Sequence, residues 1–217
     1  MLRSPVGLSY AVVALLALVV AVDLFAIYAS LNMRDLMGDI VSGDFTADRL
    51  EEANRADRLS YFSTSLALMS LIAAGVVFIV WFHRTRTNAG IFHPELQRRG
   101  PGWAIGSWFI PIANLWIPRQ IAGDIWDASE QDKRESRTVL NAWWAAWVIS
   151  TVLNQMAARM YYRAEEPAAL RTALTVDVIS GVVDMAAAVL AMLFVRKLTA
   201  LQHAKALRGP QETVVPA

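Results

Sequence analysis

Four apolar segments of membrane-spanning length dominate the pattern of hydrophobic and polar residues along the chain. A helix that crosses about 30 Å of hydrocarbon needs about 20 mostly apolar residues. The pattern therefore predicts an all-α membrane protein with four transmembrane helices, folded as one integral domain over the whole chain. The predicted spans are residues 8–31, 61–82, 139–158 and 172–195.

The first span also has features of a cleaved signal peptide. Arg3 precedes its apolar run, and small residues lie near Ala29. The run is long for a signal peptide, and cleavage stays an alternative. The other three segments span in either case.

Polar residues follow the first span and the last one. Thr46 is a candidate N-cap with Asp48 in the first turn behind it, which predicts a short surface helix leading into the second span. After the fourth span, Gly209, Pro210 and Pro216 predict a disordered tail over residues 205–217.

Residues 103–126, between the second and third spans, form an apolar run that Pro111 and Pro118 interrupt, with Asn114 between them. Proline removes a backbone donor and clashes with the preceding turn, so a straight lipid-exposed helix is disfavoured. We expect a re-entrant hairpin or two short interfacial helices, with the Asn114 side chain bonding to a backbone group freed at the break. Four tryptophans of this segment are expected at headgroup level: Trp103, Trp108, Trp116 and Trp126.

Basic residues set the predicted orientation. With four spans, 13 Lys and Arg lie on the side of the termini and 7 on the opposite side, so both termini are predicted to be cytoplasmic in a multi-pass protein of the cell membrane. All eight tryptophans lie between Trp81 and Trp147, which agrees with this placement. A five-span arrangement, in which residues 103–121 also cross, stays open.

The segment from Trp81 to Ser129 resembles the membrane family called domain of unknown function 4328, common in actinobacteria. The family pattern W-x-x-P-x-x-N-L-W-x-P is matched without departure, and Arg119 follows it. The resemblance implies a bacterial multispanning protein of the plasma membrane, and it implies no reaction. The matching residues are Trp108, Pro111, Asn114, Leu115, Trp116 and Pro118.

Composition narrows the function classes. A net charge of +1 gives no basic field for nucleic acid, and the lack of cysteine excludes disulfides and thiolate metal sites. The sequence shows no nucleophile elbow, no glycine-rich nucleotide loop and no metal-ligand spacing. We therefore nominate no catalytic residue, metal or cofactor, and the prediction leans against an enzyme.

Three acids fall inside the predicted spans: Asp23, Asp177 and Asp184. A charged aspartate near a helix centre costs about 2.5–3.5 kcal/mol, so such residues are functional candidates. Asp177 and Asp184 share one helix face, which predicts a polar seam between the first and fourth helices. The seam is either a proton or cation path or a set of hydrogen bonds that fix helix packing.

Arg84, Arg86 and Asn88 follow the second span and are candidates for a lipid-headgroup or phosphate site, or else for a positive-inside anchor. The leading interpretation is a membrane interaction, scaffold or lipid-sensing protein. Its expected partners are the lipid bilayer and a partner membrane protein or a second copy of the chain. A small proton- or cation-coupled transporter or channel that uses the three aspartates is the alternative.

Overall fold

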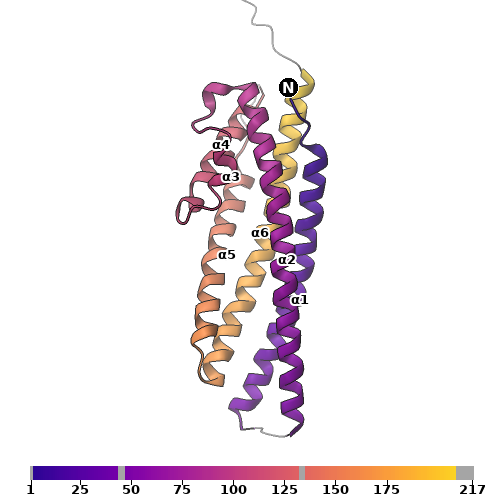
Figure 1. Cartoon of the computed structure of the whole chain (residues 1–217), viewed down its shortest axis with the longest axis vertical. Coiled ribbons are helices and arrows are strands. Elements are labelled where there is room, and N and C mark those ends of the chain that lie inside the picture. The colour runs from indigo at the N-terminus through magenta and orange to yellow at the C-terminus, as the bar shows by residue number, and fades with distance from the viewer. Residues whose placement is uncertain (1, 44–46, 132–134, 209–217) are drawn as a thin grey trace, which may run out of the picture. The chain divides into compact units, whose positions relative to one another are not determined.

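The computed structural model describes residues 2–43, 47–131 and 135–208, and in this part of the chain it contains helices and turns with no strand. The all-α prediction is confirmed. Figure 1 shows the helices, which are α1 (Val6–Val41), α2 (Ala47–Phe92), η1 (Pro94–Leu96), α3 (Trp103–Gly106), η2 (Ala113–Leu115), α4 (Ile117–Ser129), α5 (Thr138–Arg163) and α6 (Pro167–Arg208).

Among the described residues, three helices are long and apolar enough to cross a membrane, not the four predicted. They are Val6–Val41, Glu51–Phe92 and Pro167–Arg208. The predicted third span, residues 139–158, is helical as α5, but this helix is too polar to be counted with the three apolar helices of spanning length. Its apolar character is reduced by Asn141, Asn154, Gln155 and three tryptophans.

The helices extend beyond the predicted spans. α1 continues to Val41, and the expected short surface helix is the first part of α2. Arg49 pairs there with Glu52 at 2.7 Å and with Asp39 of α1 at 3.2 Å, which supports helix in a polar stretch. Thr46 lies outside the described residues.

The predicted disordered tail is wrong for residues 205–208. α6 runs to Arg208, with Lys205 and Arg208 in its last turn, where basic side chains favour a helix end. Residues 209–217 lie outside the described part of the chain.

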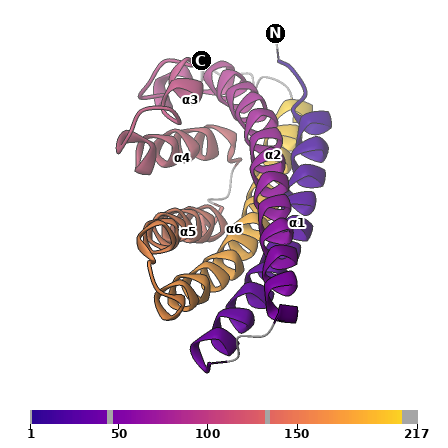
Figure 2. The same cartoon turned by 60° about the horizontal axis from the view of Figure 1, so that its bottom comes forward.

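The chain divides into two compact units that cut across the long helices. Unit 1 comprises Met1–Val13, Gly75–Asn141 and Met192–Ala217, and unit 2 comprises Ala14–Ala74 and Ala142–Ala191. Figure 2 shows the short helices α3 and α4 of unit 1, which follow the C-terminal end of α2 in the chain.

Aromatic side chains form the core of unit 1. Trp81 and Trp126 are fully buried, and both pack against Phe194 of α6, with ring centroids 5.8 Å and 6.4 Å away. The Trp81 indole donates a hydrogen bond of 3.1 Å to the Thr199 hydroxyl. Three separate stretches of sequence therefore meet in one core.

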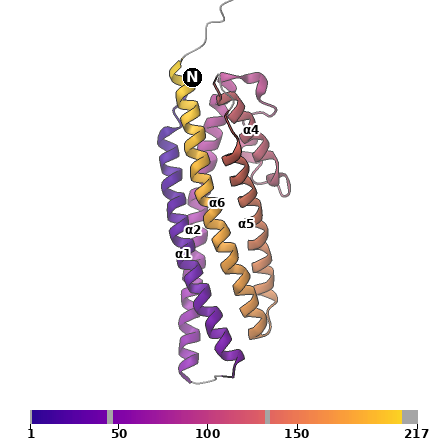
Figure 3. The same ribbon diagram turned by 180° about the vertical axis from the view of Figure 1, so that it is seen from behind.

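Unit 2 contains an antiparallel pair formed by α1 and α6, visible in Figure 3. Gly181 of α6 lies so close to α1 that a Cβ placed there would approach Ile27 to 2.9 Å. One turn further along α1, Ser30 donates to Asp177 over 2.6 Å. A small cluster of Met33, Leu36 and Leu174 packs beyond it.

Candidate functional site

The Trp/Pro/Asn segment is broken as the prolines predict. α3 ends at Gly106, and α4 begins only at Ile117. Pro111 precedes Ile112, whose φ of +67° lies in the left-handed region that a β-branched residue rarely adopts. Pro118 lies in the first turn of α4, where a missing N–H costs no helical hydrogen bond.

Residues 109–116 form an exposed apolar loop, named here the apolar tip. Phe109 is 72% exposed, Ile112 69% and Trp116 46%, and Leu115 is also exposed. Backbone bonds close the tip, since the Asn114 N–H donates to the Ile110 carbonyl over 3.1 Å. The predicted role of the Asn114 side chain is wrong, because its amide makes no hydrogen bond within the described residues.

The four tryptophans expected at headgroup level divide into two groups. Trp103 and Trp116 are exposed. Trp108 packs edge-on against Phe78 and Phe82, at 5.7 Å and 5.9 Å between ring centroids. The expectation is wrong for Trp126, which is fully buried because it fills the space beside Phe194.

An ion pair joins the chain before the tip to the chain after it. The buried Asp124 carboxylate accepts from Arg98 Nη2 at 2.6 Å and Nε at 2.9 Å, and Gln97 donates to the Asp124 carbonyl. The hydrogen bond to Asp124 raises the pKa of Arg98 above its ordinary value. These contacts tie the segment after η1 to α4.

A second pair of contacts joins α4 to the start of α5. Arg137 forms an ion pair with Asp127, and Arg119 donates to the Asn141 side chain. Burial, together with the nearby charge of Arg137, lowers the pKa of Arg119. The carboxylates of Asp124 and Asp127 are thus each paired with an arginine, and no group of three or more His, Asp or Glu residues in the described chain is placed to hold a metal ion.

The three residues predicted to bind a headgroup make internal contacts. Asn88 is buried and bonds to the backbone of Arg3 through both its amide nitrogen and its oxygen. Arg84 donates to the Ser4 carbonyl at 3.2 Å, and the buried Arg86 donates to the Arg99 carbonyl. These contacts account for their positions without a headgroup, and the headgroup role stays a prediction.

Gln202 is a site residue that the sequence analysis missed. It is 1% exposed, accepts from Asn88 at 3.2 Å, and donates to the Thr85 carbonyl at 2.8 Å. The sequence does hold a pattern that could have revealed it. Phe194, Leu198 and Gln202 are spaced four residues apart, so they lie on one face of α6, and this face is buried.

The three acids predicted to lie inside the membrane all belong to unit 2, on two helices. Asp177 meets Ser30 of α1, as the predicted seam requires. Asp184 accepts a 2.7 Å hydrogen bond from Asn154 of α5. Asp23 Oδ2 and the fully buried Ser180 hydroxyl have no hydrogen-bond partner in the described structure.

Comparisons with known proteins give a family and no activity. No curated protein and no solved structure matches the chain significantly. The model of the family described as "Domain of unknown function (DUF4328)" matches residues 45–200, which include the apolar tip, the ion pairs of α4, and Asp177 and Asp184. Because this match covers most of the sequence, the chain belongs to the DUF4328 family.

Proposed function

We propose that this protein is a membrane-embedded interaction protein whose apolar tip, residues 109–116, binds a partner membrane protein. The observation that carries the proposal is the exposure of Phe109, Ile112 and Trp116 on a loop whose flanking segments are joined by Arg98 and the buried Asp124. Exposed apolar patches of this kind mark interaction surfaces, and joining the flanking segments lowers the entropy that the loop loses on binding.

Asn114 favours a protein partner over lipid chains. Its side-chain amide lies among the apolar residues of the tip without a hydrogen bond in the described chain. In hydrocarbon an unsatisfied amide is costly, whereas a polar group on a neighbouring protein helix satisfies it. The tip is therefore better suited to a membrane-protein surface than to acyl chains alone.

The apolar helices supply the membrane anchor. Leu68, Met69 and Leu71 of α2 are each more than half exposed, as lipid-facing residues are. We include α5 in the bilayer as a fourth helix, because Asn154, one of its polar groups, is satisfied by Asp184.

We place both termini on the cytoplasmic side of a bacterial plasma membrane. The excess of 13 basic residues over 7 supports this orientation. The meeting of Arg3 and Gln202 at Asn88 supports termini on one side.

Site-specific photo-crosslinking in cells tests the proposal. A photoreactive amino acid at Ile112 should give a discrete protein adduct, and one at Ile72 of α2, which is 57% exposed on a spanning helix, should give lipid adducts only. The double substitution Phe109→Ser and Trp116→Ser should remove the protein adduct from position 112. Lipid adducts alone at both positions would overturn the proposal.

A transporter for protons or cations is the second candidate function. The buried Ser180 hydroxyl and Asp23 Oδ2 favour it, because both lack a hydrogen-bond partner in the described structure. Purified protein in vesicles should then carry a pH-dependent ion flux that Asp23→Asn abolishes. If the parent protein carries no such flux, this candidate is rejected.

A further inference from the structure

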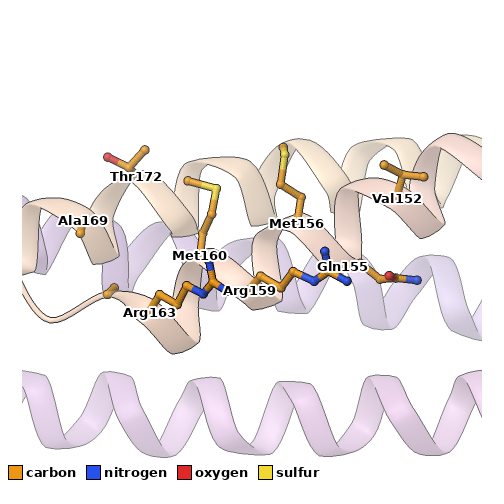
Figure 4. Close-up of a pocket in the computed structure, with 9 residues that line it drawn as sticks. Val152, Gln155, Met156, Arg159, Met160, Arg163, Ala169 and Thr172 are labelled. Carbon is orange, nitrogen blue, oxygen red and sulfur yellow. The ribbon is translucent and has the colours of Figure 1, made fainter.

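A cavity of about 660 Å³, open along the surface, lies between the C-terminal half of α5 and the start of α6, entirely within unit 2. Two rows of α5 side chains line it, each with a four-residue spacing (Figure 4). One row is apolar and consists of Val152, Met156 and Met160, and the other is polar and consists of Gln155, Arg159 and Arg163. The small residues Ala169 and Thr172 of α6 leave the opposite wall open.

The two arginines of this cavity lack counter-ions. Neither Arg159 nor Arg163 forms a hydrogen bond or ion pair with the described residues, although Glu165 and Glu166 follow directly in the chain. Both side chains are exposed. Like charges one helical turn apart repel each other, so a bound anion would stabilise the pair. The planar guanidinium group is the side chain best matched to a phosphate.

With α5 in the bilayer, as proposed above, neighbouring residues indicate the depth of the cavity. Tyr161 and Tyr162 lie on the same turns of α5 as the arginines and are 44% and 87% exposed. Exposed tyrosines are typical of the headgroup layer. Val152 and Met156 lie one to two turns deeper along α5, and methionine side chains adapt to flexible apolar ligands.

We propose that this cavity binds an anionic phospholipid. Arg159 and Arg163 bind the phosphate at headgroup depth, and an acyl chain lies along Met160, Met156 and Val152. The charge of the site selects an anionic headgroup over a zwitterionic one, in which an ammonium group opposes the arginines. This site is separate from the apolar tip and does not depend on the partner proposed for it.

Native mass spectrometry of the full chain, released from nanodiscs, tests the proposal. We expect phosphatidylglycerol to stay bound from an equimolar mixture with phosphatidylcholine. The double variant Arg159→Gln and Arg163→Gln should weaken this binding at least about tenfold. The matched control is Arg55→Gln with Arg58→Gln, which removes the same charge from exposed residues of α2 and should leave binding unchanged.

A second variant tests the apolar half of the cavity. Ala169→Phe fills the wall opposite Met160 while keeping both arginines, and it should also reduce lipid retention. Equal loss of binding in the control pair would show a nonspecific charge effect and overturn the proposal. Displacement of the lipid by inorganic phosphate at similar concentration would likewise overturn it, because the acyl chain would then contribute nothing.

Discussion

The side chain of Asn88 and the backbone of Arg3 exchange two hydrogen bonds. The Arg3 N–H donates to Asn88 Oδ1 at 3.1 Å, and Asn88 Nδ2 donates to the Arg3 carbonyl at 2.8 Å. An amide side chain of α2 thus holds the backbone that precedes α1 through a reciprocal pair of hydrogen bonds. The same Nδ2 also bonds to Gln202, so one buried residue joins both ends of the described chain.

Replacing Asn88 should destabilise unit 1. Asn88→Ala removes three hydrogen bonds and leaves the buried Gln202 oxygen unsatisfied, which should cost about 2–3 kcal/mol. Thermal unfolding in detergent measures the loss, and limited proteolysis should cut sooner near Arg3. Thr87→Ala, an exposed neighbour on α2, is the control. Equal melting temperatures for the two variants would contradict the prediction.

The two aspartates of α4 should differ in importance. The Asp124 side chain is 7% exposed and the Asp127 side chain 34%, although each pairs with one arginine. Asp124→Asn weakens several charge-assisted bonds in a buried setting and should cost about 1–2 kcal/mol, while Asp127→Asn should cost under about 1 kcal/mol. Melting temperatures of the two variants test this order, and the reverse order would refute it.

Two glycines inside helices should respond in opposite ways to a larger side chain. A Cβ at Gly181 would lie 2.9 Å from Ile27, whereas a Cβ at Gly75 meets nothing within 4 Å. Gly75→Ala should stabilise the protein by up to about 1 kcal/mol through helix propensity. Gly181→Val should destabilise it by about 1–3 kcal/mol through overpacking against α1. Adding Ile27→Ala to Gly181→Val should restore part of the lost stability. If stability is not restored, the valine does not clash with Ile27 and the prediction is wrong.

Asp184 should matter for assembly through its hydrogen bond to Asn154. Asp184→Asn keeps the size and a hydrogen-bonding group and should unfold much like the parent, whereas Asp184→Leu should lose about 0.6–2 kcal/mol. Asn154→Leu should lose a similar amount, and the double variant should lose less than the sum. Additive losses would mean that the two side chains act independently.

The sequence predicted helices wherever long apolar runs occur, and it predicted the break at Pro111 and Pro118, because both signals are local. The continuation of α1 to Val41 was missed because the apolar run ends near residue 31, whereas the helix continues through the polar residues that follow. The hydrogen bond from Asn154 of α5 to Asp184 was missed because a shared helix face does not reveal every neighbour it meets. Gln202 was missed because its partners, Thr85 and Ser129, lie far away in the sequence.

The bridge from Arg3 through Asn88 to Gln202 has a consequence for biosynthesis. Arg3 and Asn88 are translated well before Gln202, so the buried network around Asn88 stays incomplete until the last part of α6 has been made. Until then, the polar groups of Asn88 and Thr85 must form hydrogen bonds with water or with the insertion machinery instead. Nascent chains stopped before Gln202 should therefore leave the segment around Arg3 less protected from proteolysis, and translation of the last turns of α6 should restore the protection.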